Sequence, residues 1–247
     1  MDAAEANFEF SRFPRKLNLG CGLDVRPGYL NIDACSFHKP DLVADILDLP
    51  MLPSDHYDEI LAQDVLEHLP RWATRRALCE WNRLLTPAGA LTIRTTNVLG
   101  VCSALADPGN QSPARQESLL QCIFGTQHYS GDTHSTGFTE PLLRAYLTTE
   151  GFTVLDLAVK DGWLFEVNAQ KCRAAKSAEL FWRLRAIEAI ADTRDFVMQC
   201  YVTILGRHAD EEGLQWYAAQ LEAGAVDRKT AVNLLLDSEE RKSMEPL

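Results

Sequence analysis

Short apolar runs alternate with helical patterns over the first two thirds of the chain. The runs have the length and spacing of buried strands, and they are Lys16–Leu19, Tyr29–Asp33, Leu42–Ala44, Glu59–Ala62, Ala90–Thr95, Thr153–Ala158 and Leu164–Ala169. Helical periodicity separates them at Trp72–Leu85, Ala114–Phe124 and Glu140–Glu150. Strands that alternate with helices predict an α/β fold, with a largely parallel sheet covered by helices on both faces.

The strand pattern stops after about residue 172. Four helical segments follow, at Ala175–Ala191, Arg194–Leu205, Glu211–Glu222 and Arg228–Leu236. Asp210 and Asp227 stand where helix N-caps are expected. The change of periodicity predicts two domains, an α/β domain over residues 1–171 and a helical domain over residues 172–247. The alternative is that these helices pack onto the same core.

Composition and charge narrow the possible partners. The 247 residues include 35 acidic and 24 basic side chains, a formal net charge of −11. A field of this sign repels phosphate backbones, so nucleic acid is not an expected partner. No run approaches the roughly 18 apolar residues of a membrane span. Seven cysteines without a CxxC pair fit a reducing compartment, and we expect a cytoplasmic protein.

A glycine pair follows the first predicted strand, in Leu17-Asn18-Leu19-Gly20-Cys21-Gly22. Glycines at the carboxyl end of a parallel strand allow a ligand to approach the backbone. A dinucleotide fingerprint requires a third glycine at position 25, which is Val25. The phosphate-binding GxxxxGK[ST] loop is also missing. The pattern therefore favours a nucleoside ligand without phosphates and disfavours a nicotinamide enzyme.

Acidic residues end the next three predicted strands, at Asp33, Asp45 and Asp64. A carboxylate at Asp33 is placed to accept two ribose hydroxyls. Asp45 could accept the adenine amino group, with Ile46 against the ring. Each acid alone could be a solvated charge at a strand end. Consecutive strands that end in glycine or aspartate on one edge favour a binding site.

These features together resemble the class I S-adenosylmethionine-dependent methyltransferases. The resemblance rests on the glycine loop, on Asp33 and Asp45, on the block Asp-Val-Leu-Glu-His-Leu at residues 64–69, and on the turn at residues 84–89. Blocks of this kind are similar to those of small bacterial members associated with sugar and natural-product pathways. The resemblance covers roughly residues 16–170 and implies a Rossmann-like, seven-stranded sheet with S-adenosylmethionine as the cofactor.

The resemblance also implies a role for each residue at this edge. Gly20 and Gly22 would lie beneath the methionine part of the cofactor, with Leu19 and Cys21 lining the loop. Asp33 would contact the ribose, Asp45 and Ile46 the adenine, and Asp64 the amino group. The first two strands are only about ten residues apart, so the usual first helix of the family is expected to be short or missing.

Three histidines are candidates for a general base, the role that histidine fills most often. His68 opens the segment after the fourth strand, and its alternative role is to pack the cleft floor. His128 and His134 lie in a polar, glycine-rich stretch at residues 125–138, with Tyr129 and Asp132 nearby as substrate contacts. This stretch could instead be a lid whose histidines are only solvated.

Other residues are weaker candidates for a role in the site. Asn97 follows the fifth strand and could contact the acceptor or simply begin a loop. Trp163 and Trp72 could stack on a sugar ring, although core positions are the simpler expectation. His128, Asp132 and His134 are metal-ligand types, but their spacing is not typical of zinc or magnesium sites, and we expect no metal.

The helical segment carries a second resemblance. A Leu-Gly-Arg element at residues 205–207, Asp-x-x-Gly-Leu at 210–214 and Ser-x-Glu at 238–240 are similar to a small domain of unknown function related to phycobilisome linkers. That domain is found fused to bacterial glycan and cell-surface enzymes. The resemblance implies docking of a partner enzyme or self-association. The alternative is an inert helical cap.

The functional hypothesis is methyl transfer from S-adenosylmethionine to a hydroxyl of a sugar or glycan precursor, in cell-surface polysaccharide biosynthesis. The acceptor would be a small molecule or a glycan. The alternative is a non-catalytic methyltransferase-like scaffold that acts through its helical C-terminal module.

Overall fold

The computed structural model describes residues 13–128 and 131–244. The chain divides into two compact units, Met1–Ala175 and Lys176–Leu247. The division lies in the irregular segment between the last strand and the first helix of the second unit. Each unit has a hydrophobic core of its own.

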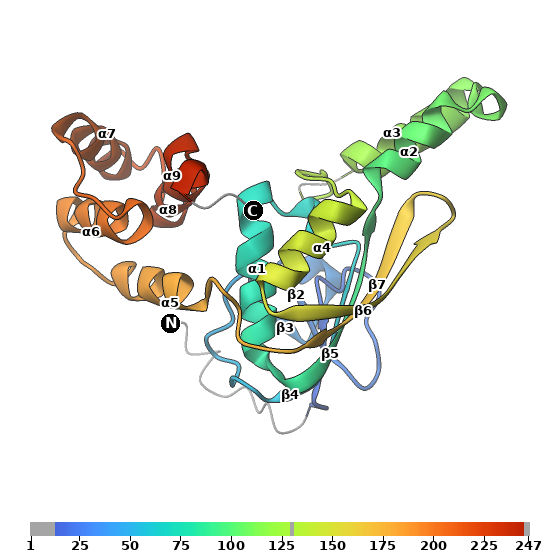
Figure 1. Ribbon diagram of the computed structural model, residues 1–247, viewed down its shortest axis with the longest axis horizontal. Coiled ribbons are helices and arrows are strands. Elements are labelled where there is room, and N and C mark those ends of the chain that lie inside the picture. Colours follow the sequence, from blue (N-terminus) through green and yellow to red (C-terminus); the bar gives the residue numbers. More distant parts are fainter. Residues whose placement is uncertain (1–12, 129–130, 245–247) are drawn as a thin grey trace. The chain divides into compact units, whose positions relative to one another are not determined.

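The first unit is built on one seven-stranded sheet, and every predicted strand is present (Figure 1). The strands are β1 Lys16–Leu19, β2 Leu30–Asp33, β3 Leu42–Val43, β4 Tyr57–Gln63, β5 Leu85–Thr96, β6 Phe152–Lys160 and β7 Leu164–Lys171. Their order is β3-β2-β1-β4-β5-β7-β6. The chain therefore leaves β1 in one direction and returns to its other side at β4, which is the switch point where open α/β sheets bind ligands.

The strand directions differ from the prediction at one edge of the sheet. The pairs from β3 through β5 are parallel, whereas β7 is antiparallel to both β5 and β6. The cause is a tight turn between β6 and β7, at Asp161 (φ 53°) and Gly162 (φ 83°). Two successive positive φ angles are what a two-residue type I′ hairpin requires. The sheet is therefore mixed.

Four α-helices belong to this unit: α1 Arg71–Leu84, α2 Val98–Ala106, α3 Pro113–Phe124 and α4 Glu140–Thr149. Figure 1 shows α1 and α4 side by side across the sheet. No helix lies between β1 and β2, as the resemblance implied. Helix α2 was not predicted because its sequence is apolar without a clear stripe, and Val101 is its one buried residue.

The core fixes the strand ends that form the site. Leu17, Leu19, Leu30 and Ile32 are fully buried in β1 and β2. Trp81 of α1 is also fully buried, and its indole N–H donates to the Ile46 carbonyl at 3.2 Å. Because a buried indole N–H needs an acceptor, this bond anchors the segment after β3 against α1.

The second unit is a small helical bundle. Its helices are α5 Ala178–Ile187, α6 Thr193–Leu205, α7 Glu211–Glu222, α8 Arg228–Leu236 and α9 Glu239–Met244. Asp210 caps α7 through the Gly213 N–H at 2.7 Å, and Asp227 caps α8 through the Thr230 N–H at 2.6 Å. Both predicted N-caps are confirmed, whereas α9 was not predicted. In the part of the chain that the structure describes, no helix is both long and apolar enough to cross a membrane.

The motif residues of the helical unit hold its own structure together. Gly206 ends α6 in the left-handed conformation, with φ 67°. A Cβ at Gly213 would lie 2.3 Å from the Tyr201 hydroxyl, so only glycine fits there. Arg207 pairs with Glu240 at 2.6 Å and with Asp210 at 3.3 Å. These residues therefore join α6, α7 and α9.

Replacing Gly20 tests how tightly the loop after β1 is packed. Gly20 has φ 61°, and a Cβ there would lie 1.9 Å from Cγ2 of Val65. Gly20→Ala combines backbone strain with overpacking and should lower the free energy of unfolding by about 2–4 kcal/mol, measured by urea denaturation. Gly22→Ala is the control, because its Cβ meets no atom within 4 Å, and it should cost about 1–2 kcal/mol. Equal losses in the two variants would show that Val65 does not limit this position.

Candidate active site

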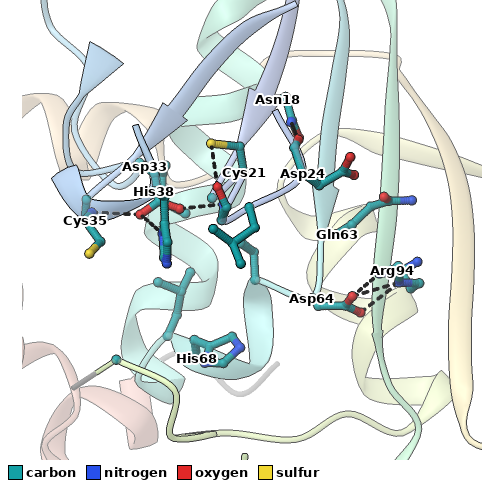
Figure 2. Close-up of a pocket in the computed structure, with 18 of the residues that line it drawn as sticks. Asn18, Cys21, Asp24, Asp33, Cys35, His38, Gln63, Asp64, His68 and Arg94 are labelled. Carbon is teal, nitrogen blue, oxygen red and sulfur yellow. Dashed lines mark hydrogen bonds and ion pairs between the residues drawn. The ribbon is translucent and has the colours of Figure 1, made fainter. Parts of the chain in front are cut away.

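A cavity of about 690 Å³ opens at the carboxyl ends of β1, β2 and β4 (Figure 2). This volume is in the usual range for sites that bind small molecules and cofactors. Most of the cofactor residues expected from the sequence line it, and these are Gly20, Cys21, Gly22, Asp33, Asp45, Ile46 and Asp64. His68, a predicted base, lines it too. Gln63, His38 and Arg94 also line it, and the sequence analysis assigned no role to them.

The glycine loop forms one wall of this cavity. Gly20 and Gly22 both have positive φ, 61° and 51°, and open space surrounds the position of a Cβ at Gly22. The backbone is therefore accessible at Gly22. Leu19 is different from the expectation, because it is fully buried in the core and does not line the cavity. The strand alternation that points Leu19 inward leaves Cys21, 5% exposed, at the cavity wall.

Asp33 ties three segments together at the end of β2. Its Oδ2 accepts the Gly22 N–H at 2.8 Å, and its Oδ1 accepts the Cys35 N–H at 2.7 Å. The His38 Nδ1 lies 3.2 Å from the same Oδ1. Because a carboxylate oxygen accepts about two hydrogen bonds, Oδ1 is satisfied within the protein. Asp33 therefore offers a ligand one acceptor site on Oδ2, and not the two that the sequence analysis expected.

The Cys21 thiol adds no charge to the loop. Burial, together with the nearby charges of Asp33 and Asp41, raises its pKa to about 11. The thiol is therefore protonated near neutral pH. It lies 3.6 Å from the Gly22 carbonyl oxygen, which it contacts as a weak donor.

Asp45 and Ile46 lie together where β3 leaves the sheet. Asp45 Oδ1 accepts the Leu47 N–H at 3.0 Å, and Ile46 is 8% exposed. A carboxylate beside an apolar side chain matches a flat heterocycle that carries an amino group. This part of the cavity has the composition that the sequence analysis expected for an adenine site.

The larger cavity is strongly anionic. Four aspartates line it, namely Asp24, Asp33, Asp45 and Asp64, and Arg94 is the one arginine or lysine among its described lining residues. With neutral histidines its formal charge is thus three negative. Such a field attracts a cationic ligand and repels a pyrophosphate.

Asp64 and Arg94 form an ion pair on the wall of the cavity (Figure 2). Arg94 Nε lies 2.8 Å from Oδ1 of Asp64, and an Nη atom of the same guanidinium contacts Oδ2. The two residues face each other because Gln63 of β4 is in register with Arg94 of β5. The Asp64 carboxylate that the resemblance assigned to a ligand amino group is therefore paired with a protein cation.

A second cavity, of about 520 Å³, shares Asp64, His68 and Arg94 with the first. Its lining includes Glu67, Thr96, Ser118, Gln121, Thr126, Asp132, His134 and Trp163. The three shared side chains are therefore the boundary between two adjoining spaces. Asp132, a predicted substrate contact, lines the second cavity and bonds to Thr126.

Glu67 anchors the glycine-rich stretch beside the second cavity. Its carboxylate is buried and accepts the Thr95 hydroxyl at 2.7 Å and the Thr96 hydroxyl at 3.3 Å. Burial raises its pKa. Its carbonyl oxygen accepts the N–H groups of Ser135 and Thr136, at 2.7 and 3.1 Å. These bonds hold the chain that follows His134.

His134 and His68 meet at the boundary of the two cavities. Their ring centroids are 4.7 Å apart, with an interplanar angle of 88°. His134 Nδ1 lies 3.1 Å from the Cys122 carbonyl oxygen. Because a carbonyl can only accept, Nδ1 carries the proton and Nε2 the lone pair when the ring is neutral. Burial, and then the neighbouring His68, lower the pKa of His134, which keeps it neutral near pH 7.

Three of the expected residues are not brought into this site. His128 is exposed and lines neither cavity. Asn97 is 9% exposed, precedes α2 and lines neither cavity. Its N–H donates to the Trp163 carbonyl at 2.8 Å, so it connects β5 to the β6–β7 turn. Tyr129 lies outside the described residues. Among residues 13–128 and 131–244, no group of three or more metal-ligand side chains is placed to hold an ion.

Comparison with known proteins adds two family matches. Residues 10–93 match the family model described as a methyltransferase domain. Residues 176–244 match a domain of unknown function, DUF4214. No curated protein sequence matches the chain significantly. The fold is a Rossmann-like methyltransferase fold, and the family match together with the cavity supports S-adenosylmethionine as the cofactor.

Solved structures similar to the first unit share less than a fifth of its residues. One is a possible exported protein from Bordetella parapertussis, with 17% identity and a TM-score of 0.48, covering 65% of this chain and 63% of that one. Another is a SAM-dependent methyltransferase from Methanosarcina mazei, with 18% identity and a TM-score of 0.47, covering 69% and 98%. A third is the 1,6-didemethyltoxoflavin-N1-methyltransferase of Burkholderia thailandensis, with 18% identity and a TM-score of 0.44, covering 64% and 71%. The chain thus matches less than two thirds of the first of these proteins.

The histidine pair makes a prediction about protonation. His134 should titrate below the ordinary histidine pKa of about 6.5 in an NMR pH titration, because burial and His68 both disfavour its charged form. His68→Phe removes one of these causes while keeping a ring, so the pKa of His134 should rise. The exposed His128 serves as the internal reference. A His134 resonance that titrates at the ordinary value in the wild-type protein would contradict the buried geometry.

Proposed function

We propose that the chain transfers the methyl group of S-adenosylmethionine to a hydroxyl of a sugar or glycan precursor, in cell-surface polysaccharide biosynthesis. The observation that carries the proposal is the shared boundary of the two cavities, made by Asp64, His68 and Arg94. A transferase needs a donor site and an acceptor site that meet at one point. Here a nucleoside-sized anionic cavity meets a polar cavity with a histidine base beside the junction.

The residues of the larger cavity fit S-adenosylmethionine. Asp33 Oδ2 would accept a ribose hydroxyl, Asp45 the adenine amino group, and Asp64 the amino group of the methionine part. The cavity's negative charge suits a ligand that carries both a sulfonium and an ammonium group. When bound, the cofactor supplies a methyl group that its positive sulfur already activates. The protein then has mainly to align the acceptor with it.

His134 is the proposed general base. Its Nε2 carries the lone pair because Nδ1 is committed to the Cys122 carbonyl, and its lowered pKa keeps it neutral. In the proposed step the acceptor oxygen forms its bond to the methyl carbon, and the hydroxyl proton moves to Nε2 of His134. A base of this kind contributes about 10²–10⁴-fold to a rate. His68 packs against the ring and holds its orientation.

The lining of the second cavity supports a hydroxyl-rich acceptor. Ser118, Gln121 and Thr126 present neutral hydrogen-bonding groups. Trp163 is half-buried at its wall, with the Arg115 guanidinium 5.1 Å from the ring centroid. An aromatic surface among hydrogen-bonding groups matches a sugar ring, which has both apolar C–H faces and hydroxyls. This lining supports the choice of a hydroxyl acceptor over a purely apolar one.

The C-terminal helices are proposed as a docking or assembly module for a partner enzyme or a second copy. Two tryptophans support this part of the proposal. Trp182 is 72% exposed and Trp216 is 49% exposed, and tryptophan is enriched at the centres of protein interfaces. The motif residues Gly206 and Gly213 serve the fold of the module itself, as described above.

The proposal predicts separate effects of two histidine substitutions. Acceptors would be screened among nucleotide-sugars and lipid-linked glycans by formation of S-adenosylhomocysteine. On the acceptor so found, His134→Gln should lower turnover about 100-fold or more, while the affinity for S-adenosylhomocysteine changes less than about twofold. His128→Gln is the matched control and should turn over normally.

Two outcomes would contradict this proposal in different ways. Normal turnover by His134→Gln would remove that residue as the base. Absence of S-adenosylhomocysteine binding by the wild-type protein at millimolar ligand, measured by isothermal titration calorimetry, would favour the non-catalytic scaffold.

A further inference from the structure

The Asp64–Arg94 pair occupies an unusual position for an ion pair. Both side chains line both cavities, and both are accessible, with Arg94 35% and Asp64 42% exposed. The Asp64 N–H also donates to the Arg94 carbonyl oxygen at 2.8 Å, so the two backbones cannot separate. Asp64 has φ 53°, a conformation that aspartate tolerates better than most residues. The pair is therefore held in place by the backbone while its charged ends face a ligand space.

Two opposite charges side by side complement a ligand that carries both charges itself. An α-amino acid group is such a ligand, because its ammonium and carboxylate are separated by one carbon. In the empty cavity Asp64 and Arg94 satisfy each other. When an amino acid group enters, each side chain can exchange its partner for the opposite ligand charge. No charge is left unpaired in either state, which avoids the large cost of an isolated charge in a partly buried site.

We infer that Asp64 and Arg94 together recognise the zwitterionic end of the methionine part of the cofactor, with Arg94 as the carboxylate-binding residue. This inference rests on the proposed function and adds a specificity-determining residue to it. Asp64 binds the ammonium group, and Arg94 turns its guanidinium from Asp64 to the carboxylate. Arginine suits this role because its planar donors match a carboxylate in a two-point contact.

The other basic groups near the cavity are engaged elsewhere. Arg26 pairs with Asp24 at 2.7 Å and donates to Gln63 at 2.8 Å, and it does not line the cavity. His38 lies against Asp33, on the side assigned to the ribose. Among the described residues that line the larger cavity, Arg94 is the one whose cation is permanent and accessible. A ligand carboxylate in this anionic site therefore depends on Arg94.

The test compares ligands that differ in one charge. S-Adenosylhomocysteine carries both the ammonium and the carboxylate, and its decarboxylated analogue, an adenosine with a 3-aminopropylthio group at the 5′ carbon, lacks only the carboxylate. Affinities of the full-length protein for both would be measured by calorimetry. Wild type should prefer S-adenosylhomocysteine. Arg94→Gln should lower this preference about tenfold or more, because Asp64 then repels the ligand carboxylate.

Control variants separate the role of Arg94 from a general loss of charge. Arg144→Gln removes an exposed arginine that pairs with Glu140 at 2.7 Å outside both cavities, and it should keep the wild-type preference. Asp64→Asn should weaken both ligands, since both carry the ammonium group. 5′-Methylthioadenosine, which lacks both charges, should bind the wild type, Arg94→Gln and Asp64→Asn with affinities that agree within about threefold.

The outcomes distinguish this inference from the proposed function. An unchanged preference in Arg94→Gln, or an equal loss for both ligands and for 5′-methylthioadenosine, overturns the role of Arg94 while cofactor binding stands. If the wild-type protein binds none of the three adenosine ligands, the proposed function fails and this inference fails with it.

Discussion

The excess of negative charge in the larger cavity is the constraint on which the account depends. Four aspartates and one arginine face this space, and in a partly enclosed site their field selects the ligand before any specific contact forms. A pyrophosphate is repelled, whereas a nucleoside with a positive sulfur is attracted. Asp33 has a second task, because it also holds Gly22 and Cys35 through its two oxygens. The group that contacts the ligand thus shapes the loop beneath it.

The fold brings these charges together through strand order. β1 lies between β2 and β4, so the ends of three parallel strands meet at one edge. Gly20 allows the chain to turn closely over Val65. The next strand, β5, adds Arg94 beside Asp64 and places Thr95 and Thr96 against Glu67. Donor cavity, boundary and acceptor cavity therefore follow one another from β2 to β5 across the sheet.

The sequence could predict the residues whose role depends on the strand end alone. Asp33 and Asp45 are of this kind, and both line the cavity. Arg94 could not be predicted, because its position depends on the register of β5 against β4. His128 and His134 are equivalent in the sequence, and only the contact with the Cys122 carbonyl of α3 separates them. The turn at Asp161 and Gly162 did carry a hairpin signal, and it was missed because the strand pattern alone suggested a parallel sheet.

A crystal structure of the protein with S-adenosylhomocysteine tests the central claim most directly. The account predicts the adenosine in the larger cavity, with a ribose hydroxyl within hydrogen-bond distance of Asp33 Oδ2 and the sulfur facing the boundary formed by Asp64, His68 and Arg94. A ligand bound elsewhere on the molecule, or a cavity closed by the protein's own side chains at saturating ligand, would contradict it.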